Sequence, residues 1–152
     1  MKVESNRFGT LEVDETKVIR FPKGLIGFPE EQSFVMVHHK GSDVVAWLQS
    51  TKTPNLALPV VSVHQFGPSY PDVPLDAAAE RAGLDGSPDD MAALVVLCAS
   101  PGAPATVNLQ APIIVDAAKW TGVQTILEGT KYTTREVFMV PAAATASAEA
   151  AP

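Results

Sequence analysis

Residues 106–116, with the sequence TVNLQAPIIVD, form the stretch that decides the fold class of this chain. Apolar side chains recur there at every second position, namely at Val107, Leu109, Ala111, Ile113 and Val115. Polar side chains take the other parity at Asn108, Gln110 and Asp116, and only Ile114 interrupts them. This alternation predicts a long β-strand with one face in a core and the other facing solvent or a partner. Because Pro112 has no N–H to donate, we expect a bend, a bulge or a sheet edge there.

Shorter apolar stretches predict further strands along the chain. A hairpin is expected over residues 1–13, because Asn6 and Gly9 suit a tight turn. Other strands are expected at residues 18–21, 34–39, 44–50, 55–63, 92–99, 122–127 and 132–140. Pro59 indicates an edge or a kink within its strand. Residues 75–83, LDAAAERAG, predict one short helix that ends at Gly83. The whole set is typical of an all-β sandwich or barrel-like domain.

The length and composition indicate one domain. The chain has 152 residues, of which 46% are hydrophobic, enough for a single sizeable core. We expect this domain to span residues 1–140, followed by a disordered Ala/Pro-rich tail at residues 141–152. No apolar run approaches the roughly 20 residues of a membrane span, and charges stand where a signal peptide needs apolar residues. Together with the single Cys98, these features predict a cytoplasmic protein with no membrane association.

The negative charge of the chain is concentrated in its middle. Eleven basic and 17 acidic residues give a net charge of −6. Residues 72–116 hold one basic side chain, Arg81, against the acidic side chains Asp72, Asp76, Glu80, Asp85, Asp89, Asp90 and Asp116. Such a segment repels phosphate backbones and favours a basic partner. We therefore expect no direct binding of nucleic acid.

The residues that most often bind metals do not form a convincing metal site. His38 and His39 are neighbours on an expected strand, so their side chains point to opposite faces. His64 has no Cys or carboxylate at ligand spacing. The loop that carries Asp85, Asp89 and Asp90 lacks the acceptor spacing and the final Glu of an EF-hand. We expect no metal and no cofactor.

Cys98 is the one candidate nucleophile of an enzyme. It lies in an apolar run at residues 94–99, where a Cys is usually buried as a small hydrophobic side chain. No nucleophile–base pair or phosphate-binding loop accompanies it. The sequence favours a binding protein over an enzyme. A small-molecule enzyme that uses Cys98 or the acidic loop is kept as an alternative, and rapid thiol labelling would distinguish the two.

Polar amides on apolar strands allow two interpretations. Gln49 and Ser50 end one expected strand, Asn108 and Gln110 share a face of residues 106–116, and Gln124 lies on the next strand. They either face solvent and satisfy turns, or form a polar recognition surface at strand edges. The residues alone leave both interpretations open.

Several stretches together resemble the FliW family of bacterial flagellar assembly factors. They occur in the order and approximate spacing of that family and cover about residues 1–140: RFG at 7–9, FPKGLIGF at 21–28, WLQS at 47–50, PSY at 68–70, TVNLQAPI at 106–113, GVQ at 122–124, and Tyr132 with Arg135. Leu58 departs from the family, which often has an aromatic residue there, and the tail has no counterpart in it.

The resemblance implies a small antiparallel β-barrel-like fold without catalytic activity. It also implies two protein partners: flagellin, and CsrA, the dimeric RNA-binding regulator that represses translation of flagellin mRNA. In this family, secretion of flagellin frees the assembly factor to sequester CsrA, and translation resumes. A flagellin-binding export chaperone without a link to CsrA is the alternative. We expect the free protein to be a monomer.

Motif membership and expected exposure suggest a surface for these partners: Leu25, Ile26, Phe28, Gln49, Ser50, Asn108 and Gln110. Phe8, Phe21, Phe34 and Trp47 are expected in the core instead, because aromatic side chains on strands usually bury. The hypothesis for Asp85, Asp89 and Asp90 is an acidic surface that, placed beside CsrA, repels RNA without covering the RNA site.

Overall fold

The computed structural model describes residues 1–38, 44–66, 79–80, 83–84, 86–99, 102–127 and 133–137. Eleven strands lie in this described part: β1 (Lys2–Ser5), β2 (Gly9–Glu12), β3 (Ile19–Arg20), β4 (Ser33–His38), β5 (Val45–Ser50), β6 (Ala57–Ser62), β7 (Met91–Cys98), β8 (Thr106–Val107), β9 (Ile113–Asp116), β10 (Thr121–Gln124) and β11 (Glu136–Val137). The 3-10 helices are η1 (Glu15–Lys17), η2 (Val63–Phe66) and η3 (Pro88–Asp90). None of the described helices is long and apolar enough to cross a membrane.

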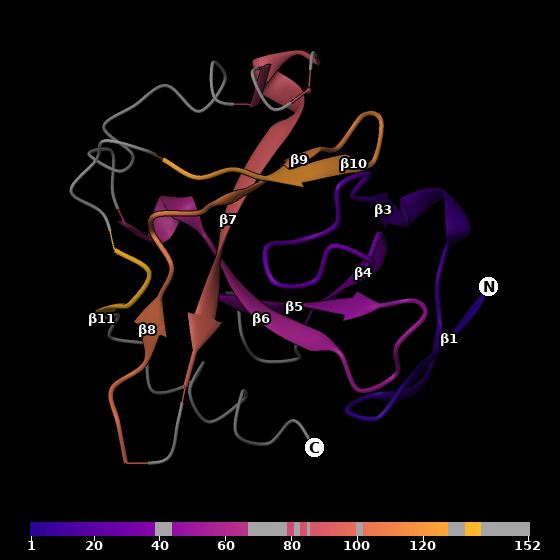
Figure 1. Ribbon diagram of the computed structural model, residues 1–152. Coiled ribbons are helices and arrows are strands. Elements are labelled where there is room, and N and C mark those ends of the chain that lie inside the picture. The colour runs from indigo at the N-terminus through magenta and orange to yellow at the C-terminus, as the bar shows by residue number, and fades with distance from the viewer. Residues whose placement is uncertain are drawn as a thin grey trace.

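Seven strands close into a barrel (Figure 1). The ring runs β7–β6–β5–β4–β3–β10–β9, and β9 pairs again with β7. Every pair is antiparallel except β3 with β10, which meet in parallel at Arg20 and Thr121. β8 and β11 extend the sheet from the end of β7, while β1 and β2 form a separate hairpin. The expected all-β, barrel-like fold is confirmed.

Residues 106–116 form two strands where we expected one. Both strands pair with β7: Val107 of β8 lies opposite Leu97, and Ile113 of β9 lies opposite Leu94. Five residues, 108–112, therefore stand opposite only two residues of β7. The expected irregularity at Pro112 is a large bulge, and Pro112 at its end cannot donate a hydrogen bond to the ladder.

Strand β9 is buried on both faces, which explains the apolar Ile114 that interrupts the alternation. Ile113 and Val115 pack inside the barrel, whereas Ile114 packs outside it against Ala79 and Leu84. The expectation that Asp116 faces solvent is wrong, since only 1% of this residue is exposed. Its Oδ1 accepts hydrogen bonds from the backbone N–H groups of residues 118 and 119 and so fixes the β9–β10 turn.

Two aromatic rings fill the barrel interior. Phe21 and Phe34 are completely buried, with their rings edge to face and their centroids 5.5 Å apart. The same buried cluster contains Ile19, Leu25, Leu48, Val60, Ile113 and Val115. A second cluster lies on the other face of β5–β7 and contains Val45, Val61, Val63, Val95, Leu97, Val107 and Leu127. The sheet at β5–β7 is therefore covered on both faces, as long apolar strands require.

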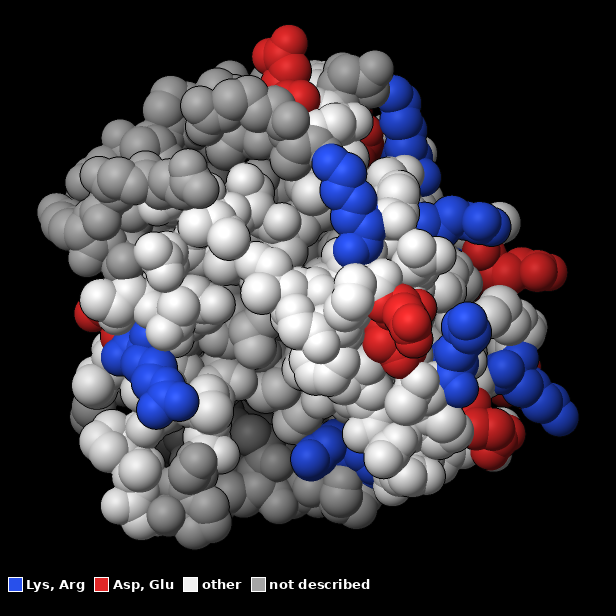
Figure 2. Space-filling view, viewed as in Figure 1, with Lys and Arg blue, Asp and Glu red and all other residues white. Residues whose placement is uncertain are grey.

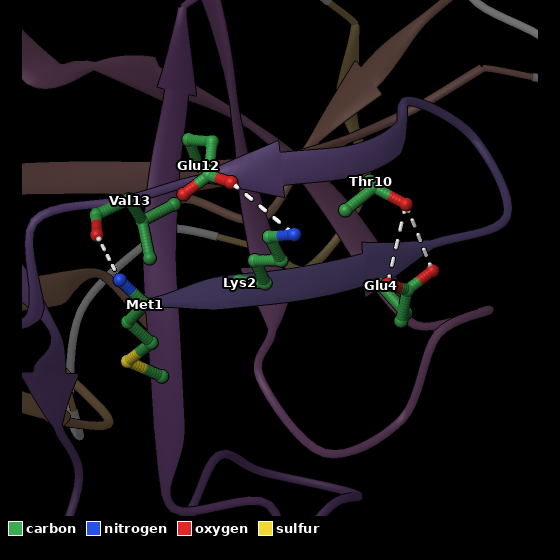
Figure 3. A network of polar contacts seen from close by, with 6 residues as sticks. All are labelled: Met1, Lys2, Glu4, Thr10, Glu12 and Val13. Atoms are coloured by element: carbon green, nitrogen blue, oxygen red, sulfur yellow. Dashed lines mark hydrogen bonds and ion pairs between the residues drawn. The ribbon is translucent and has the colours of Figure 1, made fainter.

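The N-terminal hairpin is held by contacts at its open end and along its strands (Figure 3). The Met1 ammonium group donates to the Val13 carbonyl oxygen, and the Thr10 hydroxyl donates to the Glu4 carboxylate. At the other end, Phe8 packs edge to face against Trp47 of β5, with centroids 5.8 Å apart. Trp47 is buried as expected, whereas Phe8 is only half-buried.

The predicted helix falls largely outside the described residues. Ala79 and Glu80 are helical, and Gly83 has a positive φ of 104°. The Gly83 N–H donates to the Glu80 carbonyl oxygen, and the Leu84 N–H donates to that of Ala79, which is the hydrogen-bond pattern of a Schellman cap. This geometry supports Gly83 as the C-cap. The expected tail at residues 141–152 lies outside the described residues, as do residues 132 and 138–140 of the strand expected at residues 132–140; within that range Glu136–Val137 forms β11.

We predict that Gly122→Ala destabilises the fold, because a Cβ at this position would collide with the Phe21 ring. Overpacking of this kind typically costs about 1–3 kcal/mol. Chemical denaturation of Gly122→Ala, Phe21→Leu and the double variant measures the effect and its cause. If the collision is the cause, the double variant loses less stability than the sum of the two single changes. Strict additivity would contradict this explanation.

Candidate functional site

A depression of about 230 Å³ opens at one end of the barrel interior. Its lining comes from six separate segments of the chain: Leu25, Ile26, Phe28, Leu58, Val96, Cys98, Asn108, Gln124 and Thr134. Leu25, Leu58 and Val96 also belong to the packing of the inner core, so the depression continues the interior toward solvent. We call these nine residues the mouth. Apolar hollows at the open ends of barrels are common binding sites.

The mouth exists because β6 and β7 separate. Their ladder runs from Ser62 to Val60, and the next residue of β6 is Pro59, which has no N–H to continue it. The last two residues of β7, Leu97 and Cys98, pair only with β8, which lies on the opposite edge of β7 from β6, among the described strands. Leu58 and Cys98 are left at the opening. Pro59 is thus at a local edge, as expected from the sequence, although β6 lies inside the ring.

A tight turn presents two apolar side chains at the rim of the mouth. The Phe28 N–H donates to the Leu25 carbonyl oxygen over 2.8 Å, and the Leu25 N–H donates to that of Phe28 over 3.1 Å. Gly27 has a φ of 88°, which the third position of a type II turn requires. Ile26 is 50% exposed and Phe28 is 40% exposed. This turn holds apolar surface in water in a fixed conformation.

Gln124 joins this turn to the bulge at residues 108–112. Its Oε1 accepts the Ile26 N–H over 2.9 Å, and its Nε2 donates to the Ala111 carbonyl oxygen over 3.0 Å. The Ala111 N–H in turn donates to the Asn108 Oδ1 over 3.1 Å. One amide side chain therefore joins two walls of the mouth, at Ile26 and at Ala111, that lie far apart in the sequence.

Four of the seven predicted contact residues meet at the mouth: Leu25, Ile26, Phe28 and Asn108. Gln110 is half-exposed but does not line it; its backbone is tied to Thr133 and Leu127. The sequence prediction missed Leu58, Val96, Cys98 and Thr134 as lining residues, and it named Gln124 only as part of a possible polar recognition surface. The available signals were a polar side chain at Gln124 within an apolar strand and a proline at position 59 that cannot continue a ladder. Neither signal shows which strands separate.

The exposure expected for Gln49 and Ser50 is wrong, because both are completely buried. The Ser5 hydroxyl donates to the Gln49 Oε1 over 2.7 Å, which attaches the N-terminal hairpin to the barrel. The Ser50 hydroxyl donates to the Glu31 carboxylate and accepts the Thr53 N–H. These side chains satisfy turns, which was the other interpretation of the amides. Buried polar groups need such partners.

Cys98 is exposed, contrary to the expectation that it is buried. It is the last residue of β7, at the point where β6 no longer covers this strand. Among the described residues, the lining of the mouth contains no His, Asp or Glu that would activate the thiol. The described residues form no group of three or more His, Cys, Asp or Glu side chains that could hold a metal ion. Because the thiol is accessible anyway, rapid labelling alone does not indicate an enzyme.

Only part of the predicted acidic surface can be placed. Asp89 and Asp90 are exposed in η3, whereas Asp85 lies outside the described residues. Asp116 is buried and therefore does not belong to a surface. Figure 2 shows charges of both signs interspersed along the side where β1 and β3 lie, and a broad area with few charges across the middle of the same face.

Comparisons with known proteins agree with one another. A family model described as "FliW protein" matches residues 2–138. The flagellar assembly factor FliW of Heliobacterium modesticaldum is 36% identical over 149 residues, which cover 97% of this chain and 96% of that protein. Its counterpart in Desulfitobacterium hafniense (strain DSM 10664 / DCB-2) is 38% identical over 135 residues, 89% of each protein.

A solved structure extends the agreement to the fold. The crystal structure of the flagellar assembly factor FliW superposes with a TM-score of 0.79 at 31% sequence identity, covering 92% of this chain and 98% of that one. The relatives are named as assembly factors and not as enzymes. The matched family model, the two relatives and the shared barrel lead to one conclusion: this chain belongs to the FliW family.

Proposed function

We propose that this protein is a cytoplasmic regulator of flagellar assembly that binds flagellin at the mouth and exchanges it for CsrA. The observation that carries the proposal is the exposed apolar turn of Ile26 and Phe28 beside an apolar hollow. The names of the relatives support the flagellar context. Flagellin would occupy the protein until it is secreted, after which the freed protein would sequester CsrA and relieve repression of flagellin mRNA.

The rigidity of the mouth supports its role as a protein-binding surface. Binding energy is usually concentrated in a few apolar residues that pack into a desolvated centre. A surface whose backbone is already fixed loses less entropy when a partner docks. The turn of Ile26 is fixed by its own hydrogen bonds and by Gln124. Its apolar side chains are therefore presented without the cost of ordering a loop.

The acidic residues suggest how binding to CsrA would release RNA. We propose that Asp85, Asp89 and Asp90 lie near the RNA path in the complex with CsrA. Their negative potential would then repel the phosphate backbone without covering the RNA site. Asp89 and Asp90 are exposed and form no ion pair within the described part of the chain, so their charge is available to act on a neighbour.

The exchange of partners is tested by calorimetry and size-exclusion chromatography. The free protein should elute as a monomer, bind CsrA from the same organism, and release it when flagellin is added. Ile26→Asp should weaken flagellin binding at least tenfold, because it places a charge in an apolar contact. Val137→Asp, at an apolar residue that is 64% exposed outside the mouth, is the matched control.

Two results would change the proposal. Equal losses for Ile26→Asp and Val137→Asp would remove the mouth as the binding surface. Binding of flagellin without any binding of CsrA would contradict the exchange and favour the alternative of an export chaperone that has no link to RNA control.

We predict that Gln124→Met loosens the mouth while the fold stays intact. The change keeps the size of the side chain but removes the acceptor of the Ile26 N–H and the donor to Ala111. Loss of one such bond is worth about 1 kcal/mol, so flagellin binding should weaken about fivefold. The Ile26 amide should also exchange faster with solvent. Gln110→Met is the control: the hydrogen bonds of Gln110 to Thr133 and Leu127 are made by its backbone, so this change should alter neither flagellin binding nor the exchange of the Ile26 amide.

The electrostatic mechanism predicts a separation of two activities. Reversing Asp85, Asp89 and Asp90 to Lys should preserve CsrA binding but weaken the inhibition of RNA binding by CsrA. Reversal of Glu15 and Glu30 to Lys is the control, because both residues are exposed elsewhere and neither forms an ion pair in the described part of the chain. An RNA-binding titration at low and high salt measures the effect, since salt screens it. If the protein with Asp85, Asp89 and Asp90 reversed to Lys still inhibits RNA binding by CsrA as strongly as the wild-type protein does, the mechanism is wrong.

A further inference from the structure

A second hollow lies beside the N-terminus of the chain. It has a volume of about 530 Å³, more than twice that of the mouth, and shares no lining residue with it. Its walls come from the N-terminus, η1, β3, the start of β4 and the β5–β6 turn: Met1, Glu15, Val18, Arg20, Pro22, Gln32, Ser33 and Lys52. We call this hollow the cleft.

The cleft holds a local surplus of positive charge in a chain whose net charge is −6. Arg20 and Lys52 are both exposed there, and Glu15 is the one acidic residue among the described residues that line the cleft. Within the described residues, neither Arg20 nor Lys52 forms an ion pair; the pair found there joins Lys2 to Glu12. Two cations therefore face the same hollow with no carboxylate in contact.

The backbone that carries these two cations is fixed on both sides of the cleft. The Arg20 N–H donates to the Trp120 carbonyl oxygen over 2.9 Å, which ties β3 to the β9–β10 turn. The Lys52 N–H donates to the buried Ser50 hydroxyl over 3.1 Å. The positions from which both side chains reach into the cleft are thus set before any ligand arrives.

The nearby helix η1 is also fixed by its own contacts. The Thr16 hydroxyl and backbone N–H both donate to the Asp14 carboxylate, over 2.6 and 2.9 Å. The hydrogen bond from the Thr16 side chain has the larger effect, and together with the one from the Thr16 backbone it lowers the pKa of Asp14. The Asp14 carboxylate thus stays charged and engaged with Thr16, and it is not among the residues that line the cleft.

We propose that the cleft binds an acidic peptide segment of a partner protein, with Arg20 and Lys52 each holding a carboxylate. The guanidinium group offers a planar pair of donors that matches a carboxylate, and the Lys ammonium supplies a second charge. Val18 and Pro22 provide apolar surface for the stems of the peptide's side chains. This site is separate from the mouth and does not depend on the proposed function.

The charge of the whole chain favours a short acidic segment over a nucleic acid. A nucleic acid carries its charges over a long distance and would meet the acidic residues elsewhere on the protein. A peptide with a few carboxylates needs only the local field of the cleft, because charges beyond about 8 Å are largely screened at physiological salt.

The test is a titration of the full chain with a blocked hexaglutamate peptide at low salt, in which NMR chemical shifts of the backbone amides are measured. Shifts should concentrate around Arg20, Ser33 and Lys52, and added salt should weaken binding. Arg20→Gln with Lys52→Gln should lower the affinity at least tenfold. The control, Lys23→Gln with Arg135→Gln, makes the same charge change at exposed residues outside the cleft lining. Circular dichroism and melting temperature verify that each variant is folded.

Three outcomes would overturn the proposal. No binding of the peptide at low salt would do so directly. Equal weakening in both double variants would mean that the peptide responds to net charge and not to the cleft. Inorganic phosphate that binds at the same residues as tightly as the peptide would replace the acidic peptide with a small anion as the ligand.

Discussion

The antiparallel pairing of β7 with both halves of residues 106–116 is the constraint on which the rest of the structure depends. β9 pairs with the first half of β7 and closes the barrel, while β8 pairs with its end. Prolines at positions 59 and 112 cannot donate to a ladder, so one ladder ends at β6 and the other opens into a bulge. The mouth lies where these two interruptions meet, because β6 and β7 separate next to the bulge.

Two glutamine side chains then turn these interruptions into fixed structure. Gln49 is buried and attaches the hairpin through Ser5, and Gln124 joins the turn of Ile26 to the bulge at Ala111. A loop that leaves a barrel exposes backbone N–H and C=O groups, which are costly when they are buried without partners. An amide carries a donor and an acceptor on one side chain, so it can satisfy groups on two different segments. Gln124 acts on the mouth through the backbone groups of Ile26 and Ala111, whereas Gln49 binds the Ser5 hydroxyl and the Ser50 carbonyl oxygen, which do not line the mouth.

The fold class followed from the sequence because alternation and proline positions are local signals. Residues 106–116 showed their alternation and their irregular point directly, and Gly83 indicated the end of a helix. The second buried face of β9 at Ile114 and the burial of Asp116 depend on segments that are distant in the sequence, so alternation alone misassigned them. For the same reason the polar side chains of Gln49 and Ser50 resembled an exposed surface, although their partners lie in segments that only the folded chain brings near.

The central claim is that flagellin covers the mouth, and the single cysteine of the chain allows a direct measurement. Cys98 is exposed and lines the mouth, so the rate at which a thiol reagent labels it reports whether the mouth is open. The protein is labelled alone, with flagellin, and with flagellin after Ile26→Asp. We predict rapid labelling alone, strong protection by flagellin, and loss of that protection in the variant. The account would be contradicted if Cys98 were still labelled rapidly at a flagellin concentration that, by an independent binding measurement, saturates the protein.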